Sequence, residues 1–309
     1  MRERGSLITS PTYRSDELLI VAPFSKQGAS LLEGVTLEDL AEDPSLEEVR
    51  SLARERLLAA VLGSRFHSTK SPALEVYSFV AAKLIAAGAG RSVLSRLADY
   101  EAKRFLRLCQ RLSLEQLKEI ASSTFGISTK GEIWMDLASY LKGASRIGGR
   151  KWRLVNRVVA KGYVLVDRYE LERIIAEHVR ESVLRAPKVE LPPPLVGIAE
   201  EASKLLAERT PRGAEVKGEL PPCISELLER VREGDNLTHQ SRFALVAHLL
   251  ERGWKEDQIV ELFRSLPDFK ERVTAYQVSH IAKRKYKPPS CDTMRDWGLC
   301  NTECKRRKG

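Results

Sequence analysis

Between residues 36 and 185, hydrophobic positions recur mostly at three- and four-residue spacing, which is typical of amphipathic helices. From residue 91 to 111, for example, Leu94, Leu97 and Phe105 follow this spacing. Capping signals mark the predicted helix ends. They are a capping box at Ser45 and Glu48 with a stop at Gly63, a start at Ser71-Pro72 with a stop at Gly88, and a capping box at Ser113 and Gln116. The first part of the chain is therefore predicted to be a helical body.

The pattern changes between residues 152 and 167. Two runs rich in β-branched residues flank Lys161-Gly162 there, and this arrangement predicts a β-hairpin. A further helix is expected at about 168 to 185. We therefore expect a mainly α fold, in which a small α/β element lies near the end of the helical body and a helical C-terminal domain follows.

Proline and glycine mark the expected division of the chain. Pro192–Pro194 and the polar residues 208–222 are typical of an exposed, semi-extended linker. We expect an N-terminal domain over residues 1–207, a linker over 208–222 and a C-terminal domain over 223–309. No apolar run reaches about 18 residues, and the N-terminus lacks the apolar core of a signal peptide. The sequence therefore predicts a cytoplasmic protein without a membrane span.

Positive charge is concentrated at the C-terminal end. The chain of 309 residues has a net charge of +9, and from residue 270 onward eleven Lys and Arg face only four carboxylates. A concentrated positive field favours a polyanionic partner, usually nucleic acid. For residues 305–308 a solvated tail fits equally well. Residues 283–287 surround Tyr286 within a segment of folded pattern, so there the charge points more strongly to nucleic acid.

Four of the five cysteines lie beyond the expected linker. They are Cys223, Cys291, Cys300 and Cys304, whereas Cys109 lies in an expected helix and is predicted to be a buried apolar residue. Four thiols in so small an intracellular module favour metal ligation over disulfides. Metal-binding energy would then contribute directly to the stability of that module.

The spacing of these cysteines bears on the kind of metal centre. Structural zinc sites usually contain short C-x2-C pairs. Here 67 residues separate the first two cysteines, and a C-x8-C-x3-C pattern follows. This spread favours a bulky iron–sulfur cluster and leaves zinc open. Cys223 follows two prolines at an expected helix start, where the helix dipole stabilises a thiolate.

Two expected helices of the C-terminal module carry side chains suited to nucleic acid. In the helix between Asn236 and Trp254, His239, Arg242 and Phe243 share one face near its N-terminus. Both an arginine fork and a helix N-terminus suit phosphate. An ordinary amphipathic helix with an exposed arginine explains the same pattern.

The second of these helices is expected over residues 274–287, with Thr274 as its N-cap. One stripe carries an aromatic ring, an amide, an imidazole and cations: Tyr276, Gln277, His280 and Arg284, with Lys283 beside them. Such groups stack on bases and hold a phosphate backbone. A solvated polar face is the alternative.

Signals for catalysis are missing from the sequence. No two carboxylates stand at D-x-D spacing on an expected strand, as a two-metal polymerase site requires. No P-loop is present, and no Ser or Cys nucleophile has an evident base. The sequence indicates binding without catalysis.

The C-terminal motifs together resemble those of the DNA primase large subunit family. The matching runs are PPCI at Cys223, LTHQSRF around His239 and Arg242, YQVSHI at residues 276–281 and KYKPPSC ending at Cys291. The spacing of the last two cysteines fits the archaeal branch. The resemblance covers roughly residues 215–304, and the N-terminal part is similar in kind.

The resemblance implies a noncatalytic subunit whose N-terminal domain docks on a separate small catalytic subunit of the primase. It also implies that the four C-terminal cysteines hold a [4Fe–4S] cluster. The domain around this cluster would engage the single-stranded DNA template and the initiating nucleoside triphosphate or the 5′ end of the RNA primer. By motif, His239 and Arg242 match positions that contact the triphosphate, whereas Tyr276, Gln277 and His280 match positions that face the template and primer.

The sequence therefore predicts the large subunit of a DNA primase, which supports RNA primer synthesis in DNA replication. The first rival interpretation is a zinc-bound nucleic-acid-binding adaptor without a primase role. The second is an iron–sulfur redox enzyme, and the third is a purely structural protein.

Overall fold

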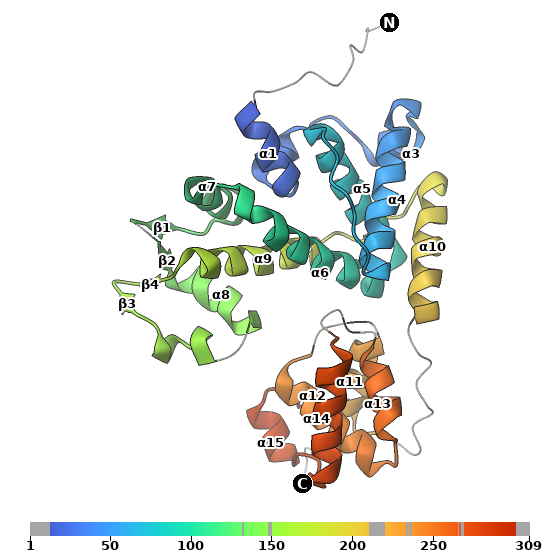
Figure 1. Cartoon of the computed structure of the whole chain (residues 1–309). Helices are drawn as coiled ribbons and strands as arrows, with labels where there is room; N and C mark the ends of the chain where they lie inside the picture. Colours follow the sequence, from blue (N-terminus) through green and yellow to red (C-terminus); the bar gives the residue numbers. More distant parts are fainter. Residues whose placement is uncertain are drawn as a thin grey trace, which may run out of the picture. The chain divides into compact units, whose positions relative to one another are not determined.

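The chain forms two compact units, residues 1–203 (unit 1) and residues 204–309 (unit 2). The computed structural model describes residues 13–131, 133–147, 150–209, 220–232, 234, 237–264, 266 and 269–300. The mainly α fold that the sequence predicts is confirmed (Figure 1).

Helices occupy part of the segments in which we expected linkers. Helix α10 (Pro193–Arg209) begins at two of the prolines, because proline suits the first turn of a helix, where its missing N–H costs nothing. Pro222, at the other end of the expected linker, opens α11 (Pro222–Arg232). Residues 210–219 lie outside the described residues, so the exact domain boundaries stay a prediction.

Unit 1 is built mainly of helices. Its α-helices before α10 are α1 (Tyr13–Val21), α2 (Lys26–Ser30), α3 (Leu37–Glu42), α4 (Glu47–Leu62), α5 (Pro72–Ala89), α6 (Arg91–Leu108), α7 (Leu114–Phe125), α8 (Leu137–Ile147) and α9 (Arg168–Leu184). Short 3-10 turns are η1 (Pro44–Leu46), η2 (Cys109–Arg111), η3 (Arg150–Trp152) and η4 (Leu154–Asn156). Helix α6 packs along α9, and α5 packs along α4.

Several predicted helix ends are confirmed. Gly63 ends α4 in the left-handed conformation, with φ 69°. The capping box of α7 is present, since the Ser113 hydroxyl accepts a hydrogen bond from the Gln116 backbone at 3.2 Å and Gln116 Oε1 accepts one from the Ser113 backbone at 2.8 Å. Both signals depend only on neighbouring residues, which is why they can be recognised in sequence.

The capping box predicted at Ser45 is wrong. Asp43 is the capping residue instead, because its carboxylate accepts a hydrogen bond from the Ser45 backbone at 2.8 Å and starts η1. Helix α4 follows directly and has no side-chain cap of its own.

Gly88 was predicted to end α5, but it lies inside that helix. Ser71 caps the start as expected, and the helix ends at Ala89 with Gly90 beyond it at φ 112°, a conformation that favours glycine. A Cβ atom at Gly88 would stand 2.5 Å from Leu191, so this glycine allows a close approach of a distant segment.

Helix α5 is long and apolar enough to cross a membrane by length and composition alone. In unit 1 it packs against α1, α4 and α6, and half of its apolar window is buried. It is therefore a core helix of this unit.

A four-stranded antiparallel sheet forms the small α/β element. The strands are β1 (Thr129–Lys130), β2 (Trp134–Asp136), β3 (Val159–Ala160) and β4 (Tyr163–Leu165), in the order β1-β2-β4-β3. The predicted hairpin is confirmed as β3–β4, and its two turn residues, Lys161 and Gly162, have φ values of 48° and 80°. Two positive φ angles match the twist of paired strands. The strands are shorter than the β-branched runs, since residues 150–156 form η3 and η4.

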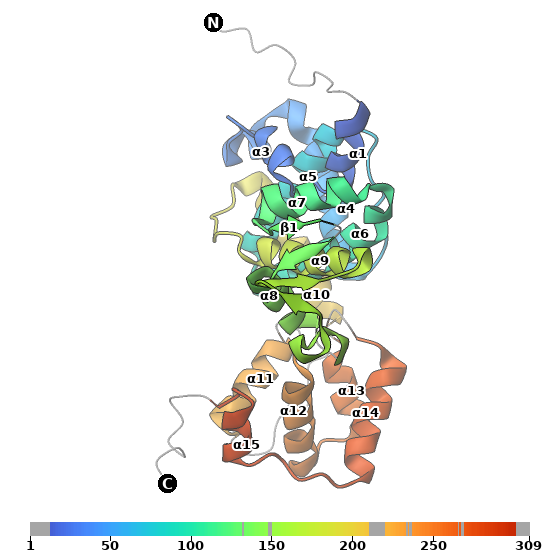
Figure 2. The same ribbon diagram turned by 90° about the vertical axis from the view of Figure 1, so that its left-hand side faces the viewer.

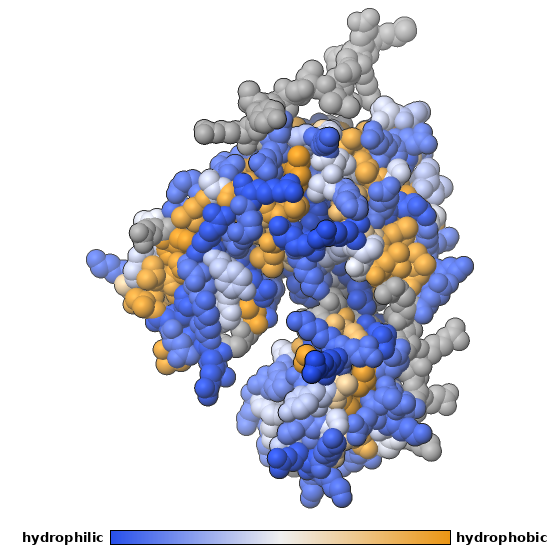
Figure 3. Space-filling view, viewed as in Figure 1, coloured by the Kyte–Doolittle hydropathy of each residue, from blue (hydrophilic) through white to orange (hydrophobic). Residues whose placement is uncertain are grey.

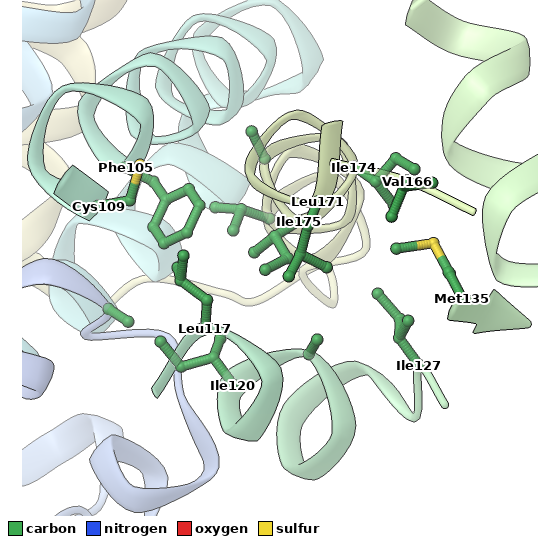
Figure 4. Packing of buried hydrophobic residues seen from close by; sticks show 14 of the residues in the cluster. Phe105, Cys109, Leu117, Ile120, Ile127, Met135, Val166, Leu171, Ile174 and Ile175 are labelled. Atoms are coloured by element: carbon green, nitrogen blue, oxygen red, sulfur yellow. The ribbon is translucent and has the colours of Figure 1, made fainter. Parts of the chain in front are cut away.

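The main core of unit 1 lies between α6, α7, α9 and the sheet. Figure 4 shows Phe105 and Cys109 from α6 and η2 meeting Leu117 and Ile120 from α7, with Leu171 of α9 between them and the sheet. All five side chains are at most 1% exposed. This core fixes the sheet and the first half of α9 against the helical body.

Unit 2 is a helical bundle around its own apolar core (Figure 2). Its helices after α10 are α11, already described, with α12 (His239–Glu251), α13 (Glu256–Phe263), α14 (Glu271–Lys283) and α15 (Cys291–Asp296). Helix α14 packs against both α12 and α13, and α11 packs against α12.

Candidate nucleic-acid and metal-binding site

The start of α12 fixes the first group of candidate residues. Thr238 caps this helix, since its hydroxyl oxygen accepts a hydrogen bond from the backbone of the buried Ser241 at 3.2 Å. His239, in the first helical turn, is exposed. Arg242 is half-buried, and its Nε donates to the carbonyl of Leu237 at 3.2 Å. The cap therefore sets the position from which these two side chains project.

A shallow pocket that is open to solvent lies between α12, α13 and α14. Four of the predicted nucleic-acid-binding residues line it: His239, Arg242 and Phe243 from α12, and Gln277 from α14. The remaining lining is mostly apolar: Val246, Phe263, Thr274, Val278 and Ile281. Residues that stand more than thirty positions apart in the chain thus share one concave surface, with a cation at its edge and an apolar floor.

The predicted start of α14 is wrong by one turn. The helix begins at Glu271, with Lys270 in the capping position and no side-chain cap. Thr274 is 8% exposed, and its backbone N–H donates to the Lys270 carbonyl at 2.9 Å. Thr274 therefore belongs to the packed face of the helix and lines the pocket.

A series of aromatic rings runs along unit 2. Tyr276 and His280 stack at a centroid distance of 6.1 Å, and His280 lies 6.1 Å from Tyr286. Phe243 contacts Tyr286 edge-on at 5.7 Å and Trp297 edge-on at 6.2 Å. The outer rings are accessible, since Tyr276 is 71% exposed and Tyr286 is 48% exposed. Exposed flat rings are platforms on which bases stack.

The cations predicted beside this stripe lie at the end of α14, outside the pocket lining. Lys283 is the last residue of the helix and Arg284 follows it, and both are exposed. Lys285 adopts a left-handed conformation with φ 49°, so the chain turns there before the exposed Lys287. These side chains form a basic edge next to the rings.

Three of the four predicted metal ligands lie in the described part of unit 2. Cys223 is the second residue of α11 and is half-buried, whereas Cys291 is the first residue of α15 and is exposed. Cys300 is half-buried, and both it and Cys223 pack against the apolar core of unit 2. Cys304 lies outside the described residues.

The donor set suits an iron–sulfur cluster in its chemistry, since such clusters are held by thiolates. Cys223 and Cys291 both lie in the first turn of a helix. Among the described residues, however, no group of three or more Cys, His, Asp or Glu is arranged to hold a metal ion. The ligand set therefore stays a prediction.

Cys109 is buried, as predicted. It is fully shielded from solvent in the core of unit 1, and this burial is the main reason that its thiol pKa rises to about 12. It lies in a different unit from the other cysteines.

Comparisons with known proteins identify the family. Residues 213–308 match the C-terminal domain of the eukaryotic and archaeal DNA primase large subunit. The chain is 32% identical to the DNA primase large subunit of Methanocella arvoryzae, over 90% of this chain and 81% of that protein. The chain belongs to the DNA primase large subunit family. The large subunit of Methanococcoides burtonii is also 32% identical, over 89% of this chain and 84% of that protein.

A shorter stretch is more similar to another relative. Over 98 residues, which are 30% of this chain, the DNA primase large subunit of Methanopyrus kandleri is 53% identical. As a member of this family, the chain is the noncatalytic component of a primase that acts in DNA replication, and its partner is a small subunit. The family expected from the sequence motifs is therefore confirmed.

Sequence reasoning missed part of the ring series. The sequence pattern marks Tyr286 only as part of a basic segment and does not single out Trp297. Both follow a helix end, and their contact with Phe243 depends on how α12, α14 and α15 pack. No local pattern carries that information.

Proposed function

We propose that unit 2 holds the template strand and a nucleoside 5′-triphosphate, and that the primase thereby starts RNA primers more readily. The observation that supports this best is the pocket that brings Arg242, His239 and Gln277 together beside exposed rings. An arginine and an imidazole at a helix N-terminus suit a phosphate group. The rings suit bases.

This arrangement fits the difficulty of primer initiation. Joining the first two nucleotides requires that both be held in place at once, and positioning reduces the entropic part of such a barrier. The small subunit would supply the reacting groups. Unit 2 would hold the template and the triphosphate in place, because a product of two nucleotides pairs too weakly with the template to stay bound by itself.

A direct test compares two reactions of the primase reconstituted with its small subunit. In Arg242→Ala we expect initiation without a primer to fall by about tenfold or more, because one charge-assisted phosphate contact is lost. Extension of a supplied primer should change much less. Arg232→Ala is the matched control, since Arg232 is exposed on α11 and, among the described residues, forms only a long ion pair with Glu229 at 3.6 Å. Equal losses in initiation and extension would refute the role.

We also propose that Cys223, Cys291, Cys300 and Cys304 hold a [4Fe–4S] cluster. When bound, the cluster would act as a structural staple for this small unit. Their thiol chemistry supports this proposal, and three of the four lie in the described part of unit 2. Iron and sulfide analysis of protein purified without oxygen tests it, with Cys291→Ser expected to lose both elements. Zinc without iron would favour the zinc-bound adaptor instead.

Docking of the small subunit would fall to unit 1. An exposed apolar strip suits this role: Val155 is 87% exposed, Val158 is 61% exposed and Val159 is 43% exposed. Figure 3 shows apolar residues over the part of unit 1 where η4 and β3 lie in Figure 1. Apolar side chains that lie together on a surface mark sites of protein contact. The cytoplasmic location belongs to this proposal too, since a primase works where the chromosome lies.

The docking surface can be tested by co-purification. We expect Val155→Glu combined with Val158→Glu to reduce recovery of the small subunit strongly, because charge would be buried at the interface. Val273→Glu is the control, since Val273 is 48% exposed but lies in unit 2. Full recovery with the double variant would place the interface elsewhere.

A further inference from the structure

A second basic pocket lies within unit 1, away from every residue used so far. It has about 1090 Å³ of space open to solvent and lies among α2, α5, α7, α8 and α9. Four cations line it: Lys26, Lys83, Lys142 and Arg185. The only carboxylate in the lining is that of Glu181. The pocket thus has a net positive charge.

The carboxylate of Glu181 is already shared among several cations. It accepts a hydrogen bond from Arg146 at 2.9 Å, is ion-paired with Arg185, and lies 3.7 Å from Lys142 Nζ. Burial alone would raise the pKa of Glu181, but Arg146 and its neighbours outweigh this effect and lower it. The single negative charge of Glu181 is therefore surrounded by the three positive charges of Arg146, Arg185 and Lys142. Lys26 and Lys83 add to this excess.

Two lysines have no carboxylate partner among the described residues. Lys83 is half-buried on α5, and its pKa is lowered by burial alone, with no neighbouring acid to offset that effect. Lys26 opens α2, and its side chain is exposed. A partly buried, unpaired ammonium is costly unless an anion accompanies it. The pocket therefore provides positive charge that the fold itself does not use.

A buried imidazole supplies an independent observation. His178 is 7% exposed and lines the pocket, and one of its ring nitrogens interacts with the Ser139 backbone. Its Nε2 is buried and has no hydrogen-bond partner within the described part of the chain. Buried polar atoms almost always have a partner, so an orphaned one calls for a ligand or water. Because burial and nearby cations lower the pKa of His178, its ring is neutral without a bound anion and Nε2 is an acceptor. An anion in the pocket would favour the protonated ring, whose Nε2–H would then donate to it.

The rest of the lining narrows the kind of ligand. Hydroxyl groups of Thr124 and Ser182 are present, and hydroxyls donate readily to phosphate oxygens. The Ser123 hydroxyl, also in the lining, already donates to the Glu119 carbonyl at 2.7 Å. The rings are already engaged, since Phe24 packs on Phe125 at 5.8 Å and Phe125 packs on His178 at 5.5 Å. Both phenylalanines are half-buried in these contacts, so they offer a base less ring surface than the exposed tyrosines of unit 2. The lining therefore suits phosphate groups better than a whole nucleotide.

The C-termini of two helices near the pocket reduce its positive potential, but only in part. Helices α7 and α9 both end there, and a helix C-terminus carries a partial negative charge of roughly half an elementary charge. Four full positive charges exceed two such partial charges and one carboxylate. The field in the pocket therefore remains positive.

We propose that this pocket in unit 1 is an anion site that binds phosphate groups, carried either by a free polyphosphate or by a nucleic-acid strand. The inference does not depend on the triphosphate site proposed for unit 2. It assigns unit 1 a role in addition to docking.

The full chain labelled with ¹⁵N-histidine tests this proposal by NMR. The ring signal of His178 is assigned by its loss in His178→Gln. We expect sodium tripolyphosphate, an oligo-dT strand or both to shift this signal at low salt. A shift with tripolyphosphate alone supports a free polyphosphate as the source, and a shift with the strand alone supports the nucleic-acid backbone. No shift with either would overturn the proposal.

Variants of the lysines localise the effect. In Lys83→Met the affinity for the anion, measured from the shift of the His178 signal, should fall about tenfold, since one charged contact is lost. Lys26→Gln should lower this affinity too, and because Lys26 is exposed, this change does not threaten folding. Lys70→Met, at an exposed lysine of unit 1 outside the pocket, should leave it unchanged. Arg242→Ala should also leave it unchanged, which separates this pocket from the site in unit 2. Equal weakening by Lys70→Met would mean nonspecific attraction and would refute a defined site.

Discussion

Glu170 ties the segment that carries the exposed valines to helix α9. Its carboxylate accepts two hydrogen bonds from Arg157, at 2.7 and 2.6 Å, and one from the Asp167 backbone at 2.9 Å. Lys151 Nζ lies 2.9 Å away, and Arg157 also donates to the Leu165 carbonyl of β4 at 2.6 Å. One carboxylate thus holds η3, the residues after η4 and the sheet together.

Glu170→Gln keeps the size of this side chain and removes its charge. Removing one partner of a buried ion pair costs about 3–5 kcal/mol. The Glu170 side chain is 2% exposed and that of Arg157 is 11% exposed, whereas Lys151 is 55% exposed and can be solvated by water. We therefore expect a loss at the low end, about 3 kcal/mol in the free energy of unfolding of unit 1.

The same pairing makes the stability depend on pH. Burial alone would raise the pKa of Glu170, but hydrogen bonds from Arg157, the Asp167 backbone and Lys151 outweigh it, so the pKa lies below its ordinary value of 4.5. A carboxyl group with a lowered pKa stabilises the fold above its unfolded pKa, and this contribution is lost as the pH falls through the folded pKa. The difference between wild type and Glu170→Gln should therefore shrink in acid.

Urea unfolding followed by circular dichroism, at neutral pH and at several acidic values, measures both effects. Glu115→Gln is the matched control, because its carboxylate is 80% exposed and, within the described part of the chain, pairs only with Lys118. A loss below about 1 kcal/mol for Glu170→Gln, the size typical of an exposed pair, would refute the reasoning. So would a difference from wild type that does not change with pH.

Three further outcomes follow from particular side chains. Lys83→Met should raise the unfolding temperature by about 2–4 °C at neutral pH, because a buried charge is removed. This gain should shrink as the pH rises toward the unfolded pKa of Lys83, since the lysine of the folded wild type is then deprotonated and no longer costs stability. Cys109 should resist a thiol reagent in the native, metal-free protein while Cys291 reacts, as counted by mass spectrometry of peptides, since Cys109 is buried and Cys291 is exposed. Gly143→Ala should lower the unfolding temperature measured by calorimetry, because its Cβ would stand 2.9 Å from the Ile174 side chain.

The sequence predicts helix ends well where the signal is local and poorly where packing decides. The box at Ser113 and Gln116 involves only its own turn, and it is present. At Ser45 the same pattern competes with Asp43 and a proline turn, which takes over the capping role. Gly88 resembles a helix stop, but its lack of a side chain serves the approach of Leu191 from a hundred residues away. A contact between residues so far apart in the chain cannot be recognised from the pattern of neighbouring residues.

For the candidate site, helical spacing was sufficient to group residues within one helix. It placed His239 and Arg242 on one face of α12 and Gln277 on α14, but only the packing of the two helices joins them in one pocket. The position of Trp297 against Phe243 could not be foreseen, since it follows the short helix α15. The basic pocket of unit 1 was missed altogether, because its residues come from five separate helices.

The two proposed anion sites differ in what surrounds the positive charge, and this difference predicts different selectivity. In unit 2, Tyr276 and Tyr286 expose ring faces beside the cations, and stacking adds about 1–3 kcal/mol per base. In unit 1, the rings of Phe24 and Phe125 pack on each other, so charge and hydroxyl groups act alone. Unit 2 should therefore prefer nucleotides and strands to inorganic polyphosphate. The pocket of unit 1 should bind phosphate whatever base it carries, which suits contact with a backbone of any sequence.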